Sequence, residues 1–286
     1  MKTTLFMLTE TSSFMMSFVI VTSKNRCIVV DGGRPLDMPL LKKYVDGRRI
    51  EAWILTHAHE DHIAGFIDEM ERNGGADFNI GTVYYNFPDY NALYAKADKA
   101  PNPEYFKQEL NNTLPAFNKI KDKFNSFIVK QGDSIGVDEV RIDFLFSFHD
   151  GLYTNLINDS SLVFKLTTPR KTVLFLGDLG PEAGNVLYQE SKDKLKADIV
   201  QMAHHGHMNV AMEVYAAIDP KACLWCCPLW LYNEPALHTL TNEQLKGRIA
   251  DGRAGLYGTG ATREWMARLG VKKHYVTGYG TQTIKL

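Results

Sequence analysis

The chain has 286 residues, which is enough for one large domain or two small ones. Apolar residues make up 45% and charged residues 23%, an ordinary composition for a globular protein, and the formal net charge is −1. A nearly neutral chain has no overall positive field to attract nucleic acid or an anionic membrane, so charge indicates neither partner.

Three short runs near the start are rich in Phe, Val, Ile and Thr and predict strands over 1–6, 13–22 and 26–30, the last two forming a hairpin. The apolar core of the second run, residues 14–21, is too short to span a bilayer, and its flanks do not suit a signal peptide. We therefore expect a cytoplasmic protein without a membrane segment. The third strand leads to Asp31 and two glycines, which allow a sharp backbone turn.

Four potential metal ligands follow the predicted buried strand 49–55, itself preceded by a predicted helix over 35–46. These ligands are His57, His59, Asp61 and His62, and a helix is expected from Phe66 onward. Imidazole nitrogen and carboxylate oxygen are favoured by Zn²⁺ and similar metals. We expect His57 and His59 to face one ion, and Asp61 and His62 to face a second. Three of the chain's nine histidines within six positions argue against a merely polar loop.

The middle of the chain predicts another strand over 79–86 and then a long, charged, helical stretch over 89–127, interrupted by three prolines. The second half alternates strands and helices without an internal repeat or a linker. The simplest organisation is one α/β (α+β) domain over 1–286. The segments predicted in the second half are strands 127–130, 140–148, 160–166, 172–176, 197–203 and 273–277, and helices 181–194, 240–250 and 262–269.

Two further segments in the second half of the chain contain potential metal ligands. Asp178 follows an apolar strand and begins a turn with glycines, where one carboxylate can bridge two metals. A helix N-cap aspartate is common in isolation, but together with the ligands at 57–62 we favour the bridging role. His204 and His205 end another apolar strand. One of them is expected to supply the remaining imidazole, the other to contact the first ligands or substrate, and His207 is a weaker candidate.

Three of the four cysteines, Cys223, Cys226 and Cys227, form a cluster of a kind that is also typical of metal or redox sites. Their neighbours are apolar, and Cys27 lies within a predicted strand. Free cysteine in such a setting behaves as a small hydrophobic residue. We therefore expect buried thiols without a chemical role.

The spacing His-x-His-x-Asp-His resembles the signature of the metallo-β-lactamase superfamily. The resemblance implies a four-layer αββα sandwich with a one- or two-metal hydrolytic centre at one edge, and a bridging role for Asp178. It also implies that the insertion 89–127 covers the active site. In that case Tyr90, Tyr94, Tyr105 and Phe106 would supply aromatic contacts; the alternative is a peripheral helical pair. Asp31 lies in a stretch that the family places near the site.

One ligand expected from the family is missing, because many members carry a further His just before the strand at 161–166. Asn158, Asp159 or His149 could replace it, or the first ion could be held by His57, His59 and Asp178 with water. The motifs Asn-Asp-x-Ser-Leu-Val, Leu-Phe-x-Gly-Asp and His-His-Gly resemble the branch that contains the hydrolase domain of the DNA-uptake protein ComEC and the phosphorylcholine esterases. The resemblance extends from about residue 13 to 280, but His207 stands where that branch usually has Ser, and a DNA substrate does not follow.

The resemblance implies a hydrolase of a phosphoester or phosphodiester that uses a metal-bound hydroxide, with Asp61 and Asp178 as catalytic residues. The expected cofactor is Zn²⁺, one or two ions, with Mn²⁺ or Fe as alternatives. A small-molecule substrate is the expected partner, and the oligomeric state is open. Alternatives are hydrolysis of a carboxylic ester, lactone, thioester or β-lactam, a di-iron redox function, which the lack of a flavodoxin-like segment disfavours, and a non-catalytic metal-binding or scaffold protein.

Overall fold

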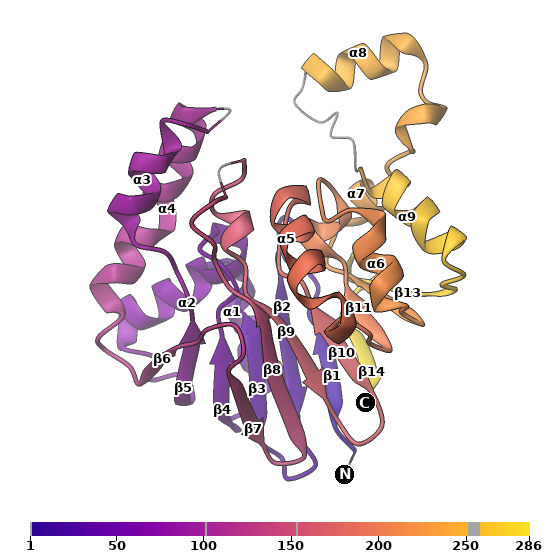
Figure 1. Cartoon of the computed structure of the whole chain (residues 1–286). Coiled ribbons are helices and arrows are strands. Elements are labelled where there is room, and N and C mark those ends of the chain that lie inside the picture. Colours follow the sequence, from indigo (N-terminus) through magenta and orange to yellow (C-terminus); the bar gives the residue numbers. More distant parts are fainter. Residues whose placement is uncertain (1, 101, 153, 251–257) are drawn as a thin grey trace.

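The computed structural model describes residues 2–100, 102–152, 154–250 and 258–286 and contains two seven-stranded sheets (Figure 1). The first sheet has the strand order β14-β1-β2-β3-β4-β5-β6, and the second has the order β13-β12-β11-β10-β9-β8-β7. The strands of the first sheet are β1 (Thr4–Met7), β2 (Ser17–Val21), β3 (Cys27–Asp31), β4 (Arg49–Ile54), β5 (Asn79–Tyr85), β6 (Ser126–Ile128) and β14 (Gln282–Lys285). Those of the second are β7 (Ser134–Val137), β8 (Val140–Phe146), β9 (Val163–Thr167), β10 (Thr172–Phe175), β11 (Ile199–Gln201), β12 (Ala222–Trp225) and β13 (Lys273–Val276).

Both sheets have an antiparallel half and a parallel half. Strands β14, β1, β2 and β3 pair antiparallel, whereas β3, β4, β5 and β6 pair parallel. In the second sheet, β7 to β10 pair antiparallel and β10 to β13 pair parallel. The carboxyl ends of neighbouring parallel strands lie at one edge of a sheet, which is where open α/β sheets bind ligands. The loops after β4, β10 and β11 carry the predicted ligands.

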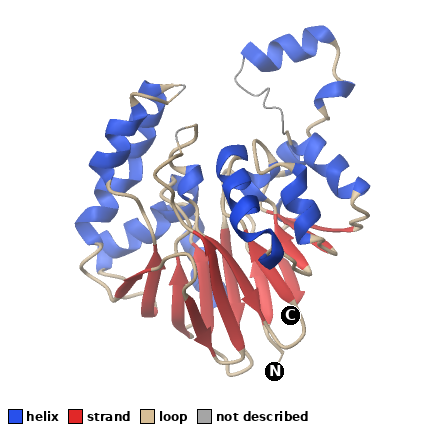
Figure 2. Cartoon of the chain, viewed as in Figure 1, coloured by secondary structure: helices blue, strands red, loops and turns tan. Residues whose placement is uncertain are grey.

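Helices cover the outer faces of the sheets (Figure 2). Apolar residues of α1, α2 and α4 pack on the first sheet, and those of α5, α6 and α9 pack on the second. The order helix, sheet, sheet, helix confirms the four-layer αββα sandwich predicted from the sequence. The helices are α1 (Met38–Val45), α2 (Glu60–Asn73), α3 (Tyr90–Ala97), α4 (Pro103–Ile120), α5 (Pro181–Ser191), α6 (Met212–Ile218), α7 (Leu229–Tyr232), α8 (Asn242–Ala250) and α9 (Thr259–Arg268).

A third apolar layer lies between the two sheets and holds them together. Phe18 on β2 meets Phe175 on β10 edge-to-face, with ring centroids 5.0 Å apart, and Phe164 on β9 stacks on Phe175 at 4.8 Å. All three side chains are fully buried. Burial of one such side chain stabilises the fold by roughly 1.5–3 kcal/mol. The alternation of inward-facing aromatic and aliphatic residues on these strands therefore explains the sheet-on-sheet contact.

The helix after β4 begins earlier than predicted, at Glu60 instead of Phe66. His59 is its extended N-cap residue, and Glu60 and Asp61 occupy the first turn, where acidic side chains interact favourably with the positive end of the helix dipole. Asp61 and His62 are therefore held by a helix and not by a loop. This places two of the predicted ligands on a rigid element.

The predicted insertion contains α3 and α4, which lie side by side (Figure 1). Helix α4 continues through Pro115, although this residue was expected to interrupt it. Leu110, Leu114 and Phe117 are buried in the same apolar cluster as Phe66 of α2, and this packing outweighs the hydrogen bond that proline removes. The assignment of 1–286 to one domain stays a prediction.

The four cysteines are free and buried, as predicted, and burial raises the pKa of Cys223 to about 12. The second strand begins at Ser17 and not at residue 13. Strands β7 and β14 and helix α6 were not predicted. Within the described chain, we find no helix with the length and hydrophobicity that a membrane crossing requires.

Candidate metal centre

The structure brings five of the predicted ligands into two overlapping groups. His57, His62 and Asp178 form one group, and Asp61, His62 and His205 form the other, with the potential ligand atoms of each group within 4.8 Å of one another. All five residues are buried. His62 belongs to both groups, whereas the prediction assigns it to the second ion.

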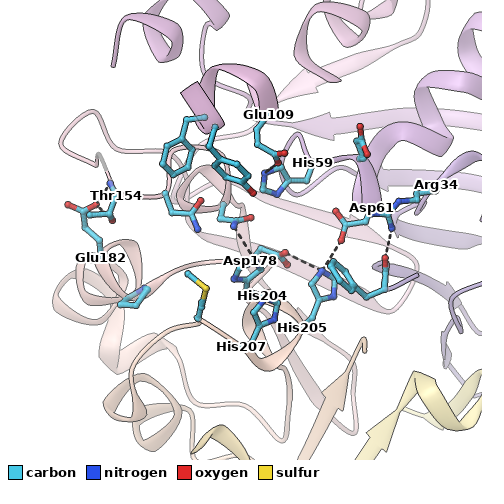
Figure 3. A pocket seen from close by; sticks show the side chains of 18 residues that line it. Arg34, His59, Asp61, Glu109, Thr154, Asp178, Glu182, His204, His205 and His207 are labelled. Atoms are coloured by element: carbon cyan, nitrogen blue, oxygen red, sulfur yellow. Dashed lines mark hydrogen bonds and ion pairs between the residues drawn. The ribbon is translucent and has the colours of Figure 1, made fainter. Parts of the chain in front are cut away.

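Asp178 lies at the middle of the cluster. Its Oδ2 atom is 3.3 Å from Nε2 of His62, 3.3 Å from Nε2 of His205 and 3.8 Å from Nε2 of His57. Asp61 approaches from α2, and its Oδ2 atom is 3.0 Å from Nε2 of His205 (Figure 3). The loop after β10 and the first turn of α2 thus bring one carboxylate each to the same set of imidazoles.

The outward nitrogens of two imidazoles are held by fixed partners. Nδ1 of His62 is 2.8 Å from Oδ2 of Asp31, and Nδ1 of His205 is 2.7 Å from the carbonyl oxygen of Cys226. Asp31 also accepts hydrogen bonds from the amide and hydroxyl of Thr56 at 2.7 Å. Metal-binding histidines characteristically donate their second ring N–H in this way, which leaves the opposite nitrogen free for the ion. The Nε2 atoms of His62 and His205 are the free ones here.

The two adjacent histidines after β11 point in different directions. Both have left-handed backbone angles, with φ of 46° at His204 and 55° at His205, and Gly206 follows with φ of 95°. A Cβ atom on Gly206 would lie 2.4 Å from the ring of Trp225, so the turn requires glycine. His205 points into the cluster, whereas the ring of His204 stacks on His207 with centroids 4.3 Å apart.

The carboxylates and imidazoles of the cluster shift one another's pKa toward the charged forms. Burial by itself lowers the pKa of His62, but the carboxylates of Asp178 and Asp61 raise it well above its ordinary value. The same carboxylates raise the pKa of His205 to about 10 against the effect of burial. Burial raises the pKa of Asp178, but the neighbouring imidazoles of His62 and His205 hold it well below its usual range. Without a cation, the buried carboxylates therefore draw protons onto these histidines.

The donor set fits one or two divalent cations. Nε2 of His62, Nε2 of His205 and Oδ1 of Asp178 are buried and meet no partner in hydrogen-bonding geometry within the described residues. Buried polar atoms are normally paired, so several unpaired atoms within one buried cluster indicate a ligand. Imidazole nitrogen and carboxylate oxygen suit Zn²⁺, Mn²⁺ and iron.

Three residues were considered as replacements for the missing histidine, and they lie in different places. Asn158 lines the pocket over the cluster, and its Nδ2 atom is 3.4 Å from Nε2 of His204. Asp159 instead accepts a hydrogen bond from the amide of Gly180 at 3.1 Å, and burial raises its pKa to about 7. His149 stacks on Phe146 and lies 3.5 Å from Glu190, outside the pocket. Of the three, Asn158 is the one that lines the pocket.

A pocket of about 690 Å³ opens over the cluster. Arg34 lies at the end beside Asp61, and Glu182 lies at the opposite end (Figure 3). Helix α4 contributes Tyr105 and Phe106 to one wall. The pocket is lined by Phe14, Arg34, His59, Glu60, Asp61, Tyr105, Phe106, Glu109, Thr154, Asn155, Asn158, Asp178, Pro181, Glu182, His204, His205, His207 and Met208.

The lining includes residues that the sequence did not indicate, notably Phe14, Arg34 and Glu109. Arg34 follows the predicted Asp-Gly-Gly turn, so its proximity could have been suspected, but no pattern marks Glu109 on its helix. Tyr90 and Tyr94 were expected near the substrate. They pack against each other, with ring centroids 5.7 Å apart, and are not among the described residues that line the pocket.

Comparison with known structures shows the same fold in distant proteins. The metallo-beta-lactamase fold protein YhfI from Bacillus subtilis aligns over all of both chains with a TM-score of 0.58 and 14% identity. CmlA, a diiron beta-hydroxylase from Streptomyces venezuelae, aligns over all of this chain and 54% of its own with a TM-score of 0.54 and 12% identity. Identities this low show the fold alone.

Comparison at the sequence level is more specific. A metal-dependent hydrolase of the UPF0173 group from Ignicoccus hospitalis is 36% identical over 50 residues, 18% of this chain, and the match spans only about a fifth (22%) of that relative. The family model of the metallo-beta-lactamase superfamily matches residues 15–219, which is more than half of the sequence and includes every predicted ligand. The chain therefore belongs to the metallo-beta-lactamase superfamily.

Proposed function

We propose that this chain is a metal-dependent hydrolase that cleaves a phosphoester or phosphodiester bond in a small molecule. The observation that carries the proposal is the pair of donor groups that share His62 at the floor of a pocket large enough for a small ligand. The matched stretch of an archaeal protein described as a metal-dependent hydrolase supports the same reaction class. We propose Zn²⁺, one or two ions, as the cofactor, with Mn²⁺ or iron as alternatives.

The residues of the site have distinct proposed roles. His57, His62 and Asp178 would hold one cation, with His59 beside His57, and Asp61, His62 and His205 would hold the other. When bound, such cations polarise the scissile bond, stabilise developing negative charge and lower the pKa of water. Asp61 borders the pocket, so its carboxylate can orient an attacking water and accept a hydrogen bond from it. Oδ2 of Asp178 lies 3.3 Å from Nε2 of both His62 and His205, so Asp178 would also contribute to the second group.

The charges along the pocket favour a compact anionic substrate group. Arg34 is the single Lys or Arg among the described residues that line the pocket, and it lies beside Asp61. Its guanidinium donates to the carbonyl oxygen of Phe14, which holds the side chain against the pocket wall. A guanidinium is well suited to a phosphoryl oxygen. Glu60, Glu109 and Glu182 line the same pocket and disfavour a long polyanion, so we propose a small molecule in preference to nucleic acid.

The Asn-Asp-Ser-Ser-Leu-Val stretch at 158–163 supports placement in the ComEC-like and phosphorylcholine-esterase-like branch. In this structure Asn158 lies at the pocket and Asp159 holds the amide of Gly180, next to the loop of Asp178. Asn158 contacts His204, whereas Asp159 holds the loop that follows Asp178. The resemblance to this branch is the reason to prefer a phosphoester over the carboxylic ester, lactone, thioester and β-lactam alternatives.

The test combines metal analysis of the purified protein with hydrolysis of bis(p-nitrophenyl) phosphate, using p-nitrophenyl acetate for comparison. We expect one to two metal ions per chain, and loss of at least 100-fold in phosphodiester turnover in Asp61→Ala and Asp178→Ala. Asp193→Ala changes an exposed carboxylate outside the pocket and should retain full activity.

Each other outcome points to a different function. Bound metal without phosphodiester turnover would overturn the substrate class and favour the ester, lactone, thioester and β-lactam alternatives. Absence of bound metal after supplementation with Zn²⁺, Mn²⁺ and Fe²⁺ would overturn the hydrolase proposal and favour a scaffold protein.

A further inference from the structure

His59 lies at the margin of the cluster and faces the helical insertion. Its Nδ1 atom is 3.1 Å from Nε2 of His57, and its Nε2 atom is 3.3 Å from Oε2 of Glu109 on α4 (Figure 3). The two ring nitrogens therefore have different neighbours. Nδ1 faces His57, and Nε2 faces the carboxylate of Glu109, which lies 50 positions further along the chain.

The contact between His59 and Glu109 resembles the contacts of the more deeply buried histidines, His62 and His205. At His62 the outward nitrogen meets Asp31, and at His205 it meets the carbonyl oxygen of Cys226. In each case an acceptor fixes which nitrogen carries the proton and leaves the other one for a cation. Glu109 is in the corresponding position for His59. It differs from the other two acceptors in coming from the insertion and not from the loops of the two sheets.

A second contact joins the same helix to the same turn. The hydroxyl of Thr113, one helical turn after Glu109, donates to the carbonyl oxygen of Ala58, and both groups are buried. Tyr105, one turn before Glu109, lines the pocket. One face of α4 thus contacts the substrate space, the outward nitrogen of His59 and the backbone of the metal-binding turn.

We propose that Glu109 is a positioning residue for His59, and that metal binding and docking of α4 onto the turn at 57–59 stabilise each other. The proposal rests on the proposed metal centre. By accepting a hydrogen bond from Nε2–H, Glu109 keeps Nδ1 of His59 available and oriented toward His57. Because coupling between two sites is reciprocal, a cation that holds His59 in this orientation also strengthens its contact with Glu109. Binding of the cation then also orders the part of α4 that forms the pocket wall.

The first experiment measures Zn²⁺ affinity by competition with a chromophoric chelator. Replacement of an outer partner of a metal-binding histidine typically weakens metal affinity 10- to 100-fold, so we expect a loss in this range for Glu109→Ala. Glu109→Gln retains an oxygen acceptor and should lose less. Glu104→Ala is the matched control, because Glu104 lies on the same helix with an 88% exposed side chain. The visible spectrum of the Co²⁺-loaded protein should change in Glu109→Ala and stay unchanged in Glu104→Ala.

The second experiment measures amide hydrogen exchange in residues 103–120 with and without Zn²⁺. Exchange in the wild-type helix should slow when metal binds, and this effect should be lost in Glu109→Ala. Wild-type metal affinity in Glu109→Ala, or exchange in α4 that is indifferent to metal, would overturn this proposal alone. A wild-type chain that binds no metal would overturn the proposed function as well. Should Glu109→Ala fail to fold by circular dichroism, Glu109→Gln carries the same comparison.

Discussion

At the scale of single residues, the adjacent His204 and His205 show that the direction of the backbone determines the charge of a histidine side chain. Burial lowers the pKa of His204 to about 4, so this ring is neutral near pH 7. The pKa of His205 is instead raised to about 10, because Asp178 and Asp61 face it. Identical side chains at consecutive positions therefore differ in charge, and the cause is the left-handed turn that sends one toward the carboxylates and the other toward His207.

This difference predicts unequal effects of substitution. His205→Ala should remove up to one metal equivalent per chain, since its Nε2 atom completes the group with Asp61 and His62. His204→Ala should retain the metal content of the wild type. Elemental analysis after gel filtration measures both. Equal losses in the two variants, or a greater loss in His204→Ala, would contradict this assignment.

At the scale of elements, the turn between β7 and β8 connects the second sheet to the first. Glu139 accepts hydrogen bonds from the amide and hydroxyl of Ser23 at 2.7 and 2.6 Å, and from the hydroxyl of Thr3. Burial raises the pKa of Glu139, but these hydrogen bonds to the charged form outweigh it and lower the pKa to about 2. The neighbouring Asp138 also has a pKa of about 2, chiefly because Arg26 donates to it. The turn thus contributes to stability only while it is ionised.

A lowered pKa in the folded state predicts a definite dependence of stability on pH. The contribution of Glu139 is complete above its unfolded pKa of about 4.5 and is lost as the pH falls toward 2. Glu139→Gln should lower the free energy of unfolding at pH 7 by about 1–3 kcal/mol. Urea denaturation should show that the difference in free energy of unfolding between Glu139→Gln and wild type shrinks as the pH falls from 7 to 2.5. The exposed Asp193→Asn is the control, and a difference that stays constant with pH would refute the argument.

At the scale of the whole molecule, the metal centre lies at the seam between the two sheets. His57 and Asp61 come from the loop and helix after β4 of the first sheet, whereas Asp178 and His205 follow β10 and β11 of the second. A cation held by both sets would therefore link the two halves of the sandwich. Without it, the buried carboxylates face protonated imidazoles, a weaker and pH-dependent link.

Removal of metal should therefore destabilise the whole chain. A ligand present at 100 times its Kd adds about 2.7 kcal/mol to the folded state. For a protein of this size, we expect chelation to lower Tm by roughly 5–10 °C, measured by calorimetry with and without EDTA. Asp178→Ala should show little change on chelation. A wild-type Tm that is insensitive to both EDTA and added Zn²⁺ would exclude a structural contribution of the metal.

The parts of the site that could be predicted are those that depend on short stretches of sequence. The ligands at 57–62 lie within six positions, so any compact local structure brings them together. Asp178 and His205 each follow an apolar run that ends a buried strand, which indicates an edge of a sheet. The four-layer fold was expected from the resemblance to the metallo-β-lactamase superfamily, which the spacing of this motif carries.

Tertiary structure decided the remainder, because the relevant contacts join distant segments through side-chain direction. Glu109 reaches His59 across 50 positions, and its helix could have docked with another face inward. The choice between His204 and His205 depends on their left-handed backbone angles and on the following Gly206, where the ring of Trp225 leaves no room for a Cβ atom. The chemical identity of the site was thus determined by local sequence. Its outer partners and its pocket were determined by packing, which no short pattern encodes.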